Sequence, residues 1–543
     1  MGFLCRRLFW LPLMVLSTRP LPAQITPHVQ EAFQFEARTR RSLPTQEPTG
    51  FLEHIVNGKL TLSLSDAIRL ALLNNTDIRI EEEQVQTAKN ALERARGVFD
   101  PVFQGSFNSA RQVTPEYTEL EGGPPTLNQL NQNTLLAISQ NLETGANVQA
   151  SFSSSKSTSN STFFFFSPAF FTGLSFTFTQ PLLRGAGLFV NGAPIVIGQR
   201  GVSQARANFE AEVNDLLLQV VDDYWSVIQA RENLVVQQES LDAAQKSYDH
   251  DKHALELGAL PPLDIYRSQS QVASRRVSVI QAEYALKQQE DQLRRDLAAD
   301  IDPNIRALDL DLTEKPDPHG TLMTIDIPTA LDKALNYRPE LESLRQQLAS
   351  DDVNIRVAHN GLEPSLVLQG GYTTSGLNSI LSNGNFEAGS YGSAVSQMFG
   401  FGFPTYSGGI TLSYPFRNRQ AQAQLGDALS SKRRDLYSDR RLREQITLEV
   451  RNAVHQLEES KLSMEAAKVA LDYAQKTVEA EQHKYELGAE TVFFVLEAQT
   501  ERTQAQQNLL QAEVGYQNAT AQVEHDTGGL LAEFQVEITN LSH

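Results

Sequence analysis

Residues 253–259 read His-Ala-Leu-Glu-Leu-Gly-Ala, and residues 483–489 read His-Lys-Tyr-Glu-Leu-Gly-Ala. A glycine just past a helix supplies the left-handed conformation that ends it, so each stretch is expected to close a helix in a turn. Colinear similarity continues outward, because residues 62–72 resemble residues 325–335 in the same order along the chain. The chain is therefore predicted to contain two copies of one structural unit.

Long helices are predicted on both sides of each turn. Apolar residues recur every seven positions before the turns, at Val213, Val220, Val227, Leu234, Leu241, Tyr248 and Leu255 and again at Val450, Leu457, Met464, Leu471, Val478 and Tyr485. A heptad kept this long predicts helices that supercoil against a neighbour. One helix over residues 199–257 would be about 88 Å long. Each copy is expected to begin with a shorter helix, at residues 65–96 and 328–360.

Two short segments alternate apolar and polar residues with a period of two. Their apolar members are Leu174, Phe176, Phe178, Ile410, Leu412 and Tyr414. This period fits a barrel strand with lipid on one side and a polar lumen on the other, and it also fits a half-buried soluble sheet. The run Phe163–Phe166 favours the membrane, because it would promote aggregation in water yet suits an interfacial aromatic girdle. We therefore expect these six side chains to face lipid.

The beginning of the sequence has the features of an export signal. Arg6 and Arg7 precede a short apolar stretch at residues 8–16, and Leu21-Pro22-Ala23 resembles a cleavage site. Nine apolar residues are too few to cross a bilayer, which takes about 20. We expect residues 1–23 to be a signal peptide and the protein to be exported.

Composition excludes several function classes. The net charge of −19 disfavours a nucleic-acid partner. The single cysteine, Cys5, excludes a thiolate zinc site or a disulfide scaffold within the chain. His250 and His253 have metal-like spacing but no visible third ligand, and no Gly-x-Ser-x-Gly or His-Glu-x-x-His motif occurs. We therefore predict no catalytic site, no cofactor and no metal.

The duplicated order of helix, strands and helical hairpin resembles the TolC-type outer-membrane efflux protein family. The paired Ala-Leu helices, the strand exit at residues 180–185 and the two Glu-Leu-Gly-Ala turns carry the resemblance. It implies an α+β fold with a duplicated strand and long-helix-hairpin repeat, in which a trimeric outer-membrane β-barrel is continued by a periplasmic α-helical coiled-coil barrel. The predicted organisation is signal peptide 1–23, N-terminal extension 24–59, first repeat 60–323, second repeat 324–530 and C-terminal tail 531–543.

The number of strands is a separate question. The family usually donates four strands per protomer, whereas the first copy has extra strand-like segments at residues 135–142 and 147–152. These segments fit either an added hairpin, which gives six strands, or an ordered extracellular loop. We expect four strands in the barrel.

The implied function is that of a passive exit channel of a tripartite efflux or secretion system. The implied partners are two further copies of the chain, a periplasmic adaptor (membrane fusion protein), an inner-membrane pump of the RND or ABC type, and outer-membrane lipid. The cargo is left open among drugs, metals, proteins and metabolites. The alternatives are an exported coiled-coil structural protein or adhesin without a channel, and a periplasmic enzyme.

The resemblance also implies a periplasmic gate near the two turns. Tyr485 matches the family's gate tyrosine, and Asp264 and Glu497 match acidic positions, but the arginine position holds Glu490 and a further acidic position holds Phe494. In a trimer the three carboxylates would form rings that favour cations, unless they are solvated helix ends. Phe494, with its neighbour Phe493, would form a constriction or pack between helices. The adaptor is expected to contact the turns at Leu257, Gly258, Ala259, Leu487, Gly488 and Ala489.

Overall fold

The computed structural model describes residues 48–115, 126–161, 167–257, 265–318, 322–382, 385–487 and 489–536. All described residues belong to one compact unit, Pro48–His543. The predicted signal peptide and the run Phe163–Phe166 lie outside the described residues.

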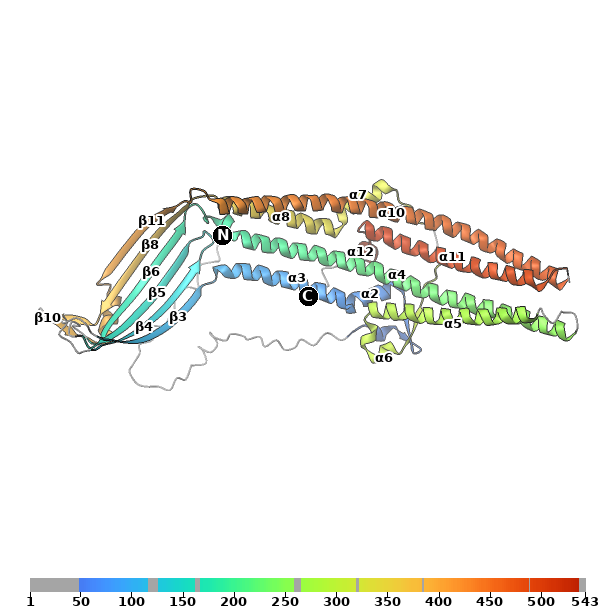
Figure 1. Ribbon diagram of the computed structural model, residues 1–543, viewed down its shortest axis with the longest axis horizontal. Helices are drawn as coiled ribbons and strands as arrows, with labels where there is room; N and C mark the ends of the chain where they lie inside the picture. The colour runs from blue at the N-terminus through green and yellow to red at the C-terminus, as the bar shows by residue number, and fades with distance from the viewer. Residues whose placement is uncertain are drawn as a thin grey trace. The chain divides into compact units, whose positions relative to one another are not determined.

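The main sheet has six antiparallel strands in the order β11-β8-β6-β5-β4-β3 (Figure 1). Their bounds are β3 Val102–Pro115, β4 Thr126–Asn141, β5 Asn147–Ser159, β6 Ala169–Pro181, β8 Ser365–Leu377 and β11 Pro404–Ser413. The expectation of four strands is wrong, because β4 and β5 pair continuously from Gln129↔Ser159 to Asn141↔Asn147. This added hairpin carries the same alternation as its neighbours, so it extends both faces of the sheet without a break.

Two smaller sheets accompany the main one. Strand β2 pairs antiparallel with β1 and in parallel with β7, and β9 pairs with β10. Their bounds are β1 Ile55–Val56, β2 Lys59–Leu62, β7 Asp309–Leu312, β9 Ser379–Ser382 and β10 Asn385–Ala388. The short helices are η1 Phe51–His54, η2 Gly97–Phe99, η4 Ala299–Ile301, α6 Pro303–Arg306, α9 Tyr391–Phe399 and α12 Leu530–Glu533.

Two pairs of long helices follow the strands, as the heptads predicted. Their bounds are α4 Leu188–Glu256, α5 Ile265–Asp296, α10 Arg419–Glu486 and α11 Val492–Asp526. Helix α4 has 69 residues, which corresponds to about 104 Å. It packs along α5, and α10 packs along α11 (Figure 1). The heptad positions Val213, Val220 and Val450 are buried. None of the helices in the described residues is both long and apolar enough to cross a membrane.

The single helices predicted at residues 65–96 and 328–360 are each two helices. Their bounds are α2 Leu64–Asn74, α3 Thr76–Arg96, α7 Ile327–Tyr337 and α8 Pro339–Asn360. Oδ1 of Asn75 accepts a hydrogen bond from the Asp77 backbone N–H at 2.7 Å and so starts a new helix. Pro339 opens α8 because its missing N–H and fixed φ suit a first turn and not a helix interior.

The largest apolar core joins α2, α4 and the β2–β7 sheet to α11 of the second copy. Tyr224 of α4 is fully buried there, and its hydroxyl donates to the carbonyl oxygen of Leu62 at 3.2 Å. Leu510 and Val514 of α11 pack into the same core. The two copies therefore fold as one body.

A buried histidine adds an ionic contact between α11 and α4. Nε2 of His525 lies 2.7 Å from Oδ1 of Asp215, and its Nδ1 lies 2.9 Å from Oδ1 of Asp526. Burial lowers the pKa of His525, but the hydrogen bonds to these two carboxylates outweigh it and raise that pKa to about 9. The imidazole is therefore charged at neutral pH and holds the end of α11 against α4.

Candidate functional site

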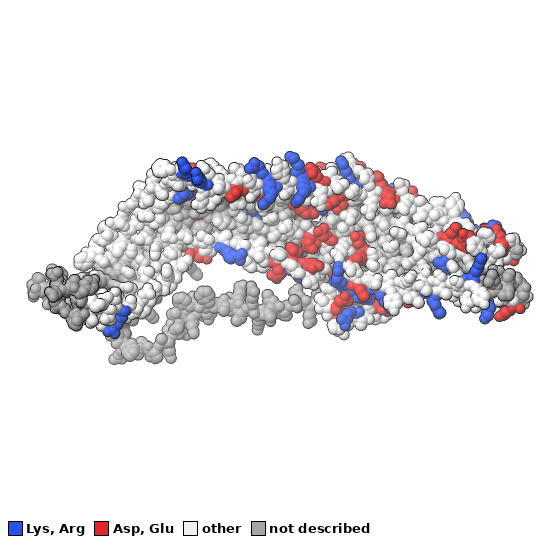
Figure 2. All heavy atoms as spheres, viewed as in Figure 1, with Lys and Arg blue, Asp and Glu red and all other residues white. Residues whose placement is uncertain are grey.

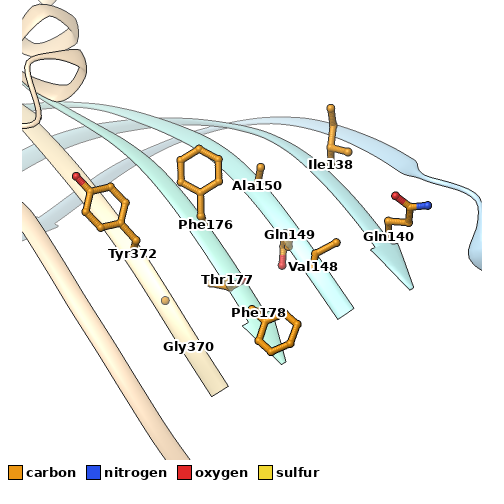
Figure 3. Close-up of a pocket in the computed structure, with 11 residues that line it drawn as sticks. Ile138, Gln140, Val148, Gln149, Ala150, Phe176, Thr177, Phe178, Gly370 and Tyr372 are labelled. Atoms are coloured by element: carbon orange, nitrogen blue, oxygen red, sulfur yellow. The ribbon is translucent and has the colours of Figure 1, made fainter. Parts of the chain in front are cut away.

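One face of the main sheet is apolar across all six strands. Phe176 of β6 lies opposite Ala150 and Tyr372, and Ala150 in turn lies opposite Ile138, which faces Phe103 of β3. Directly paired residues point to the same side of a sheet. Phe176, Ala150 and Ile138 project from the same side of their strands in Figure 3. By the same register this face also includes Phe107, Leu136, Val148, Leu174, Phe178, Leu368, Tyr406, Ile410 and Leu412.

Most of these apolar side chains are exposed in the single chain, whereas Val148, Ala150, Leu174 and Tyr372 are half-buried. Phe176 is 46% exposed and Ile410 is 68% exposed. The five predicted residues that lie within strands, Leu174, Phe176, Phe178, Ile410 and Leu412, thus share one face, while Tyr414 follows the end of β11 and is also exposed. A shallow apolar depression of about 510 Å³ lies on this sheet where Ala150 and Gly370 leave space beside Phe176 (Figure 3).

The opposite face is mostly polar and carries no charged residue within the described strands, although Leu135 and Phe171 also lie on it. Thr177 lies opposite Gln149 and Gly371. Other members of this face are Gln104, Ser106, Ser139, Ser151, Ser175, Thr373, Ser407 and Thr411. A sheet with one apolar and one hydroxyl-rich face can separate lipid from a water-filled space.

Both edges of the sheet lack a strand partner within the described residues. Strand β3 pairs only with β4, and β11 only with β8. Every residue of β11 is exposed, as is nearly all of β3. The five antiparallel pairings between them leave β3 and β11 running in opposite directions. Such edges present unpaired N–H and C=O groups that can accept a strand from another copy.

At the far ends of the long helices, a buried carboxylate joins the two hairpins. Asp251 of α4 is fully buried, and its Oδ1 accepts a hydrogen bond from the Tyr485 hydroxyl of α10 at 2.8 Å. Its Oδ2 accepts a hydrogen bond from the hydroxyl of Ser268 on α5. His250 lies beside them, with its Nδ1 3.5 Å from the Tyr485 oxygen. One carboxylate thus holds three helices together near the turns.

The sequence predicted Tyr485 at this place but missed Asp251 and Ser268. Asp264, one of the predicted acidic residues, lies outside the described residues. The missed signal is positional, since Asp251 lies seven residues before Gly258 and one heptad after Ala244, which is buried. A charged residue at such a position requires a buried partner.

The other predicted gate residues do not form one cluster. Oε1 of Glu490 lies 3.3 Å from the ammonium of Lys484, which also pairs with Glu481 at 2.6 Å. Glu497 is exposed on α11. The side chain of Phe494 is 46% exposed, and its ring contacts the ring of Phe493. Packing within one protein chain therefore does not bury Phe494.

The two turns expose large apolar side chains. Leu257 is 72% exposed and Leu487 is 78% exposed. Ala489 is exposed as well, whereas Gly258, Ala259 and Gly488 lie outside the described residues.

In the part of the chain that the structure describes, no group of three or more His, Cys, Asp or Glu side chains could hold a metal ion.

Comparison with known proteins identifies the family. The family model described as outer membrane efflux protein matches residues 147–299 and 330–529. Outer membrane protein TolC of Vibrio cholerae is 24% identical over 339 residues, which cover 61% of this chain and 72% of that protein. TolC of Escherichia coli is 23% identical over 320 residues, which cover 57% of this chain and 60% of that protein.

Solved structures share the fold. The CmeC outer membrane channel of Campylobacter jejuni superposes with a TM-score of 0.63 at 17% identity, over 88% of this chain and 89% of that chain. VceC of Vibrio cholerae gives a TM-score of 0.62 at 13% identity, over 86% and 96% respectively. The predicted duplicated strand and helical-hairpin fold is confirmed.

These matches favour the predicted exit channel over the coiled-coil structural protein or adhesin, and the family is one of channels rather than of enzymes. The matched regions fall in both copies of the repeat and include the main sheet from β5 onward and the helical hairpins. The chain belongs to the outer membrane efflux protein family and is an efflux channel protein of the outer membrane.

Proposed function

We propose that three copies of the chain close their sheets into one eighteen-stranded barrel in the outer membrane, through which solute leaves the cell. The apolar face containing Phe176 would contact lipid, and the hydroxyl-rich face containing Thr177 would line the pore. The helical hairpins would continue this pore into the periplasm as a duct.

The two edge strands, β3 and β11, support this proposal, because neither has an outer strand partner within the described residues. Because β3 and β11 run in opposite directions, β11 of one copy can pair antiparallel with β3 of the next, and repeating this step closes a ring. A barrel of 16–18 strands is wide enough for an aqueous channel. The number of copies, three, is taken from the family resemblance. Three copies with six strands each give a barrel of eighteen strands.

Cysteine crosslinking tests the closure. Only Cys5 is present in the sequence, so an engineered pair forms an unambiguous disulfide. A double variant with Ser106→Cys on β3 and Thr411→Cys on β11 should yield linked dimers and trimers in native membranes, with no larger species. Neighbouring pore-face pairs, such as Ser106 with Ser407, test other registers. The control pairs Ser151→Cys on the interior strand β5 with Thr411→Cys and should stay monomeric. Linkage of the control, or none for any edge pair, would disprove the closure.

The gate is proposed to close through Asp251. Its two hydrogen bonds join α4 and α5 of the first copy to α10 of the second, and an opening motion that separates the hairpins must break the bond to Tyr485. The family's gate arginine would pair with a carboxylate, and Glu490, which stands at the arginine position, cannot form that pair. The contact between Asp251 and Tyr485 takes its place. Phe494 is proposed to narrow the same mouth, since its ring is half-exposed within one copy.

Cation selectivity at the mouth is proposed to come mainly from Glu497, with Asp264 contributing. Three exposed carboxylates in a narrow trimeric mouth concentrate cations. Glu490 contributes less, because Lys484 of the same copy pairs with it. Glu497→Gln should lower the cation preference measured as a reversal potential across a salt gradient in planar bilayers, and Glu490→Gln should change it less. Equal reversal potentials for Glu497→Gln and the native channel would exclude Glu497 from the constriction.

The exposed turns are proposed to bind the periplasmic adaptor that links the channel to an inner-membrane pump. Leu257 and Leu487 supply apolar contact area at equivalent places in the two copies, which suits a partner that repeats around the mouth. Replacing both leucines with Glu should abolish recovery of the adaptor with the trimer. Trimer assembly itself should persist, because neither side chain packs inside the copy.

A further inference from the structure

Only two charged residues occur within the bounds of the six strands of the main sheet, and both are basic. They are Arg111 on β3 and Lys156 on β5. Lys156 lies opposite Phe170 of β6, six residues from Ala150 along β5, and Arg111 lies eight residues from Phe103 along β3. Even spacings keep both on the apolar face. The sheet, which has no other charged residue within its strands, thus carries two cations on the side proposed to meet lipid.

Both cations lie toward the end of the sheet that is farther from the long helices. Lys156 is eight residues from Val148 of the apolar face, about 27 Å along the strand. For strands tilted by about 35–45° this corresponds to about 20 Å along the membrane normal, close to the height of the apolar band of a barrel. Figure 2 shows the strands in view largely free of charge, with blue side chains near that end. The cations therefore fall at the boundary between lipid tails and headgroups.

Among the described residues, the contacts of both cations leave their charges available. Nζ of Lys156 lies 5.9 Å from the ring centre of Phe170. Nε of Arg111 donates to Oδ1 of Asn128 at 3.0 Å. Both partners are neutral, so they orient the side chains without cancelling their charge. A ring beneath an ammonium also holds it at the edge of an apolar surface.

The register places the two cations within reach of one ligand. Arg111 lies opposite Leu130 of β4, and Leu130 lies opposite Thr158 of β5, two residues beyond Lys156. Two strand spacings and two residues separate their Cα atoms by about 12 Å. Their side chains are long enough to converge on a single headgroup.

We propose that Arg111 and Lys156 bind the headgroup of an anionic, phosphate-bearing lipid in the outer leaflet. This proposal rests on the proposed placement of the sheet in the membrane. Guanidinium and ammonium groups both bind phosphate oxygens well, and a nearby anionic surface attracts each cation. The adjoining apolar face would contact the tails of the same lipid. This site would fix the height of the barrel in the membrane and keep a ring of lipid around it.

Native mass spectrometry of the purified trimer tests the site with phosphatidylglycerol and phosphatidylcholine as probes. The native trimer should retain phosphatidylglycerol in preference. The double variant Arg111→Gln and Lys156→Gln should lose about 30-fold in that preference, or about fivefold per cation. The charge-conserving variant Arg111→Lys and Lys156→Arg should retain it. Inorganic phosphate at millimolar concentration should not displace the lipid, because it lacks the tails.

A matched control removes two exposed cations from the helical part, as Arg443→Gln and Lys476→Gln, and should bind lipid like the native chain. Equal phosphatidylglycerol retention by the native and Gln double variants, or an equal loss in the control, would overturn the lipid site. Displacement by inorganic phosphate would mean a free-anion site instead and would also overturn it. Trimer mass in the same spectra separates these outcomes from a failure of the proposed barrel, which would remove the trimer itself.

Discussion

Replacing Tyr485 with Phe removes one hydroxyl group and leaves the ring in place. That hydroxyl donates to Oδ1 of Asp251 at 2.8 Å, and Asp251 has no exposure to solvent. A hydrogen bond to a charged group contributes about 1.5–3 kcal/mol. If the mouth opens by separating α4 from α10, the closed state should lose this amount in each copy. The opening equilibrium would then rise by about 10- to 150-fold per copy.

Single-channel recording in planar bilayers measures this change as open probability. Tyr473→Phe is a matched control, because Tyr473 lies on the same helix and is 64% exposed. Asp251→Asn keeps an acceptor without the charge and should open the channel less than Tyr485→Phe does. Equal open probabilities for Tyr485→Phe and Tyr473→Phe would refute the assignment of Asp251 and Tyr485 as the closing contact.

The other predictions concern the sheet and the helical core. Phe176→Arg should cost about 2–4 kcal/mol of barrel stability near the membrane midplane, measured by urea unfolding in lipid vesicles, whereas Thr177→Arg on the pore face should cost much less. Similar losses for both would contradict the assigned faces. Ile446→Ala should cost about 2–5 kcal/mol, because Ile446 is fully buried, while the exposed Leu448→Ala should be nearly neutral in the same measurement. The pKa of His525 is raised to about 9, above the value of about 6.5 expected when unfolded, so its stabilisation is complete below pH 6.5 and is lost as the pH rises through 9. His525→Gln should flatten the curve of stability against pH between 6.5 and 9. An unchanged slope would show that the contacts of His525 with Asp215 and Asp526 do not cause the pH dependence.

The helical part shows which features follow from local sequence. The heptads specified long helices because a seven-residue period keeps one stripe of a helix apolar at every turn, and Val213 and Val450 are buried accordingly. The sequence predicted one helix across Asn75, because apolar periodicity continues through this position. The break depends on the side-chain cap of Asn75 alone, and a single capping residue does not change a periodic pattern.

The sequence by itself determined the duplication, the long helical hairpins and the alternating faces of Leu174–Phe178 and Ile410–Leu412, since each of these is a periodicity along the chain. Tertiary structure alone decided that the extra hairpin of the first copy is inserted into the sheet, which raises the strand count to six. It also decided that Asp251 bonds to Tyr485, 234 residues away. Strand pairing and hydrogen bonding between distant residues depend on which surfaces meet after folding, and no local period in the sequence encodes that choice.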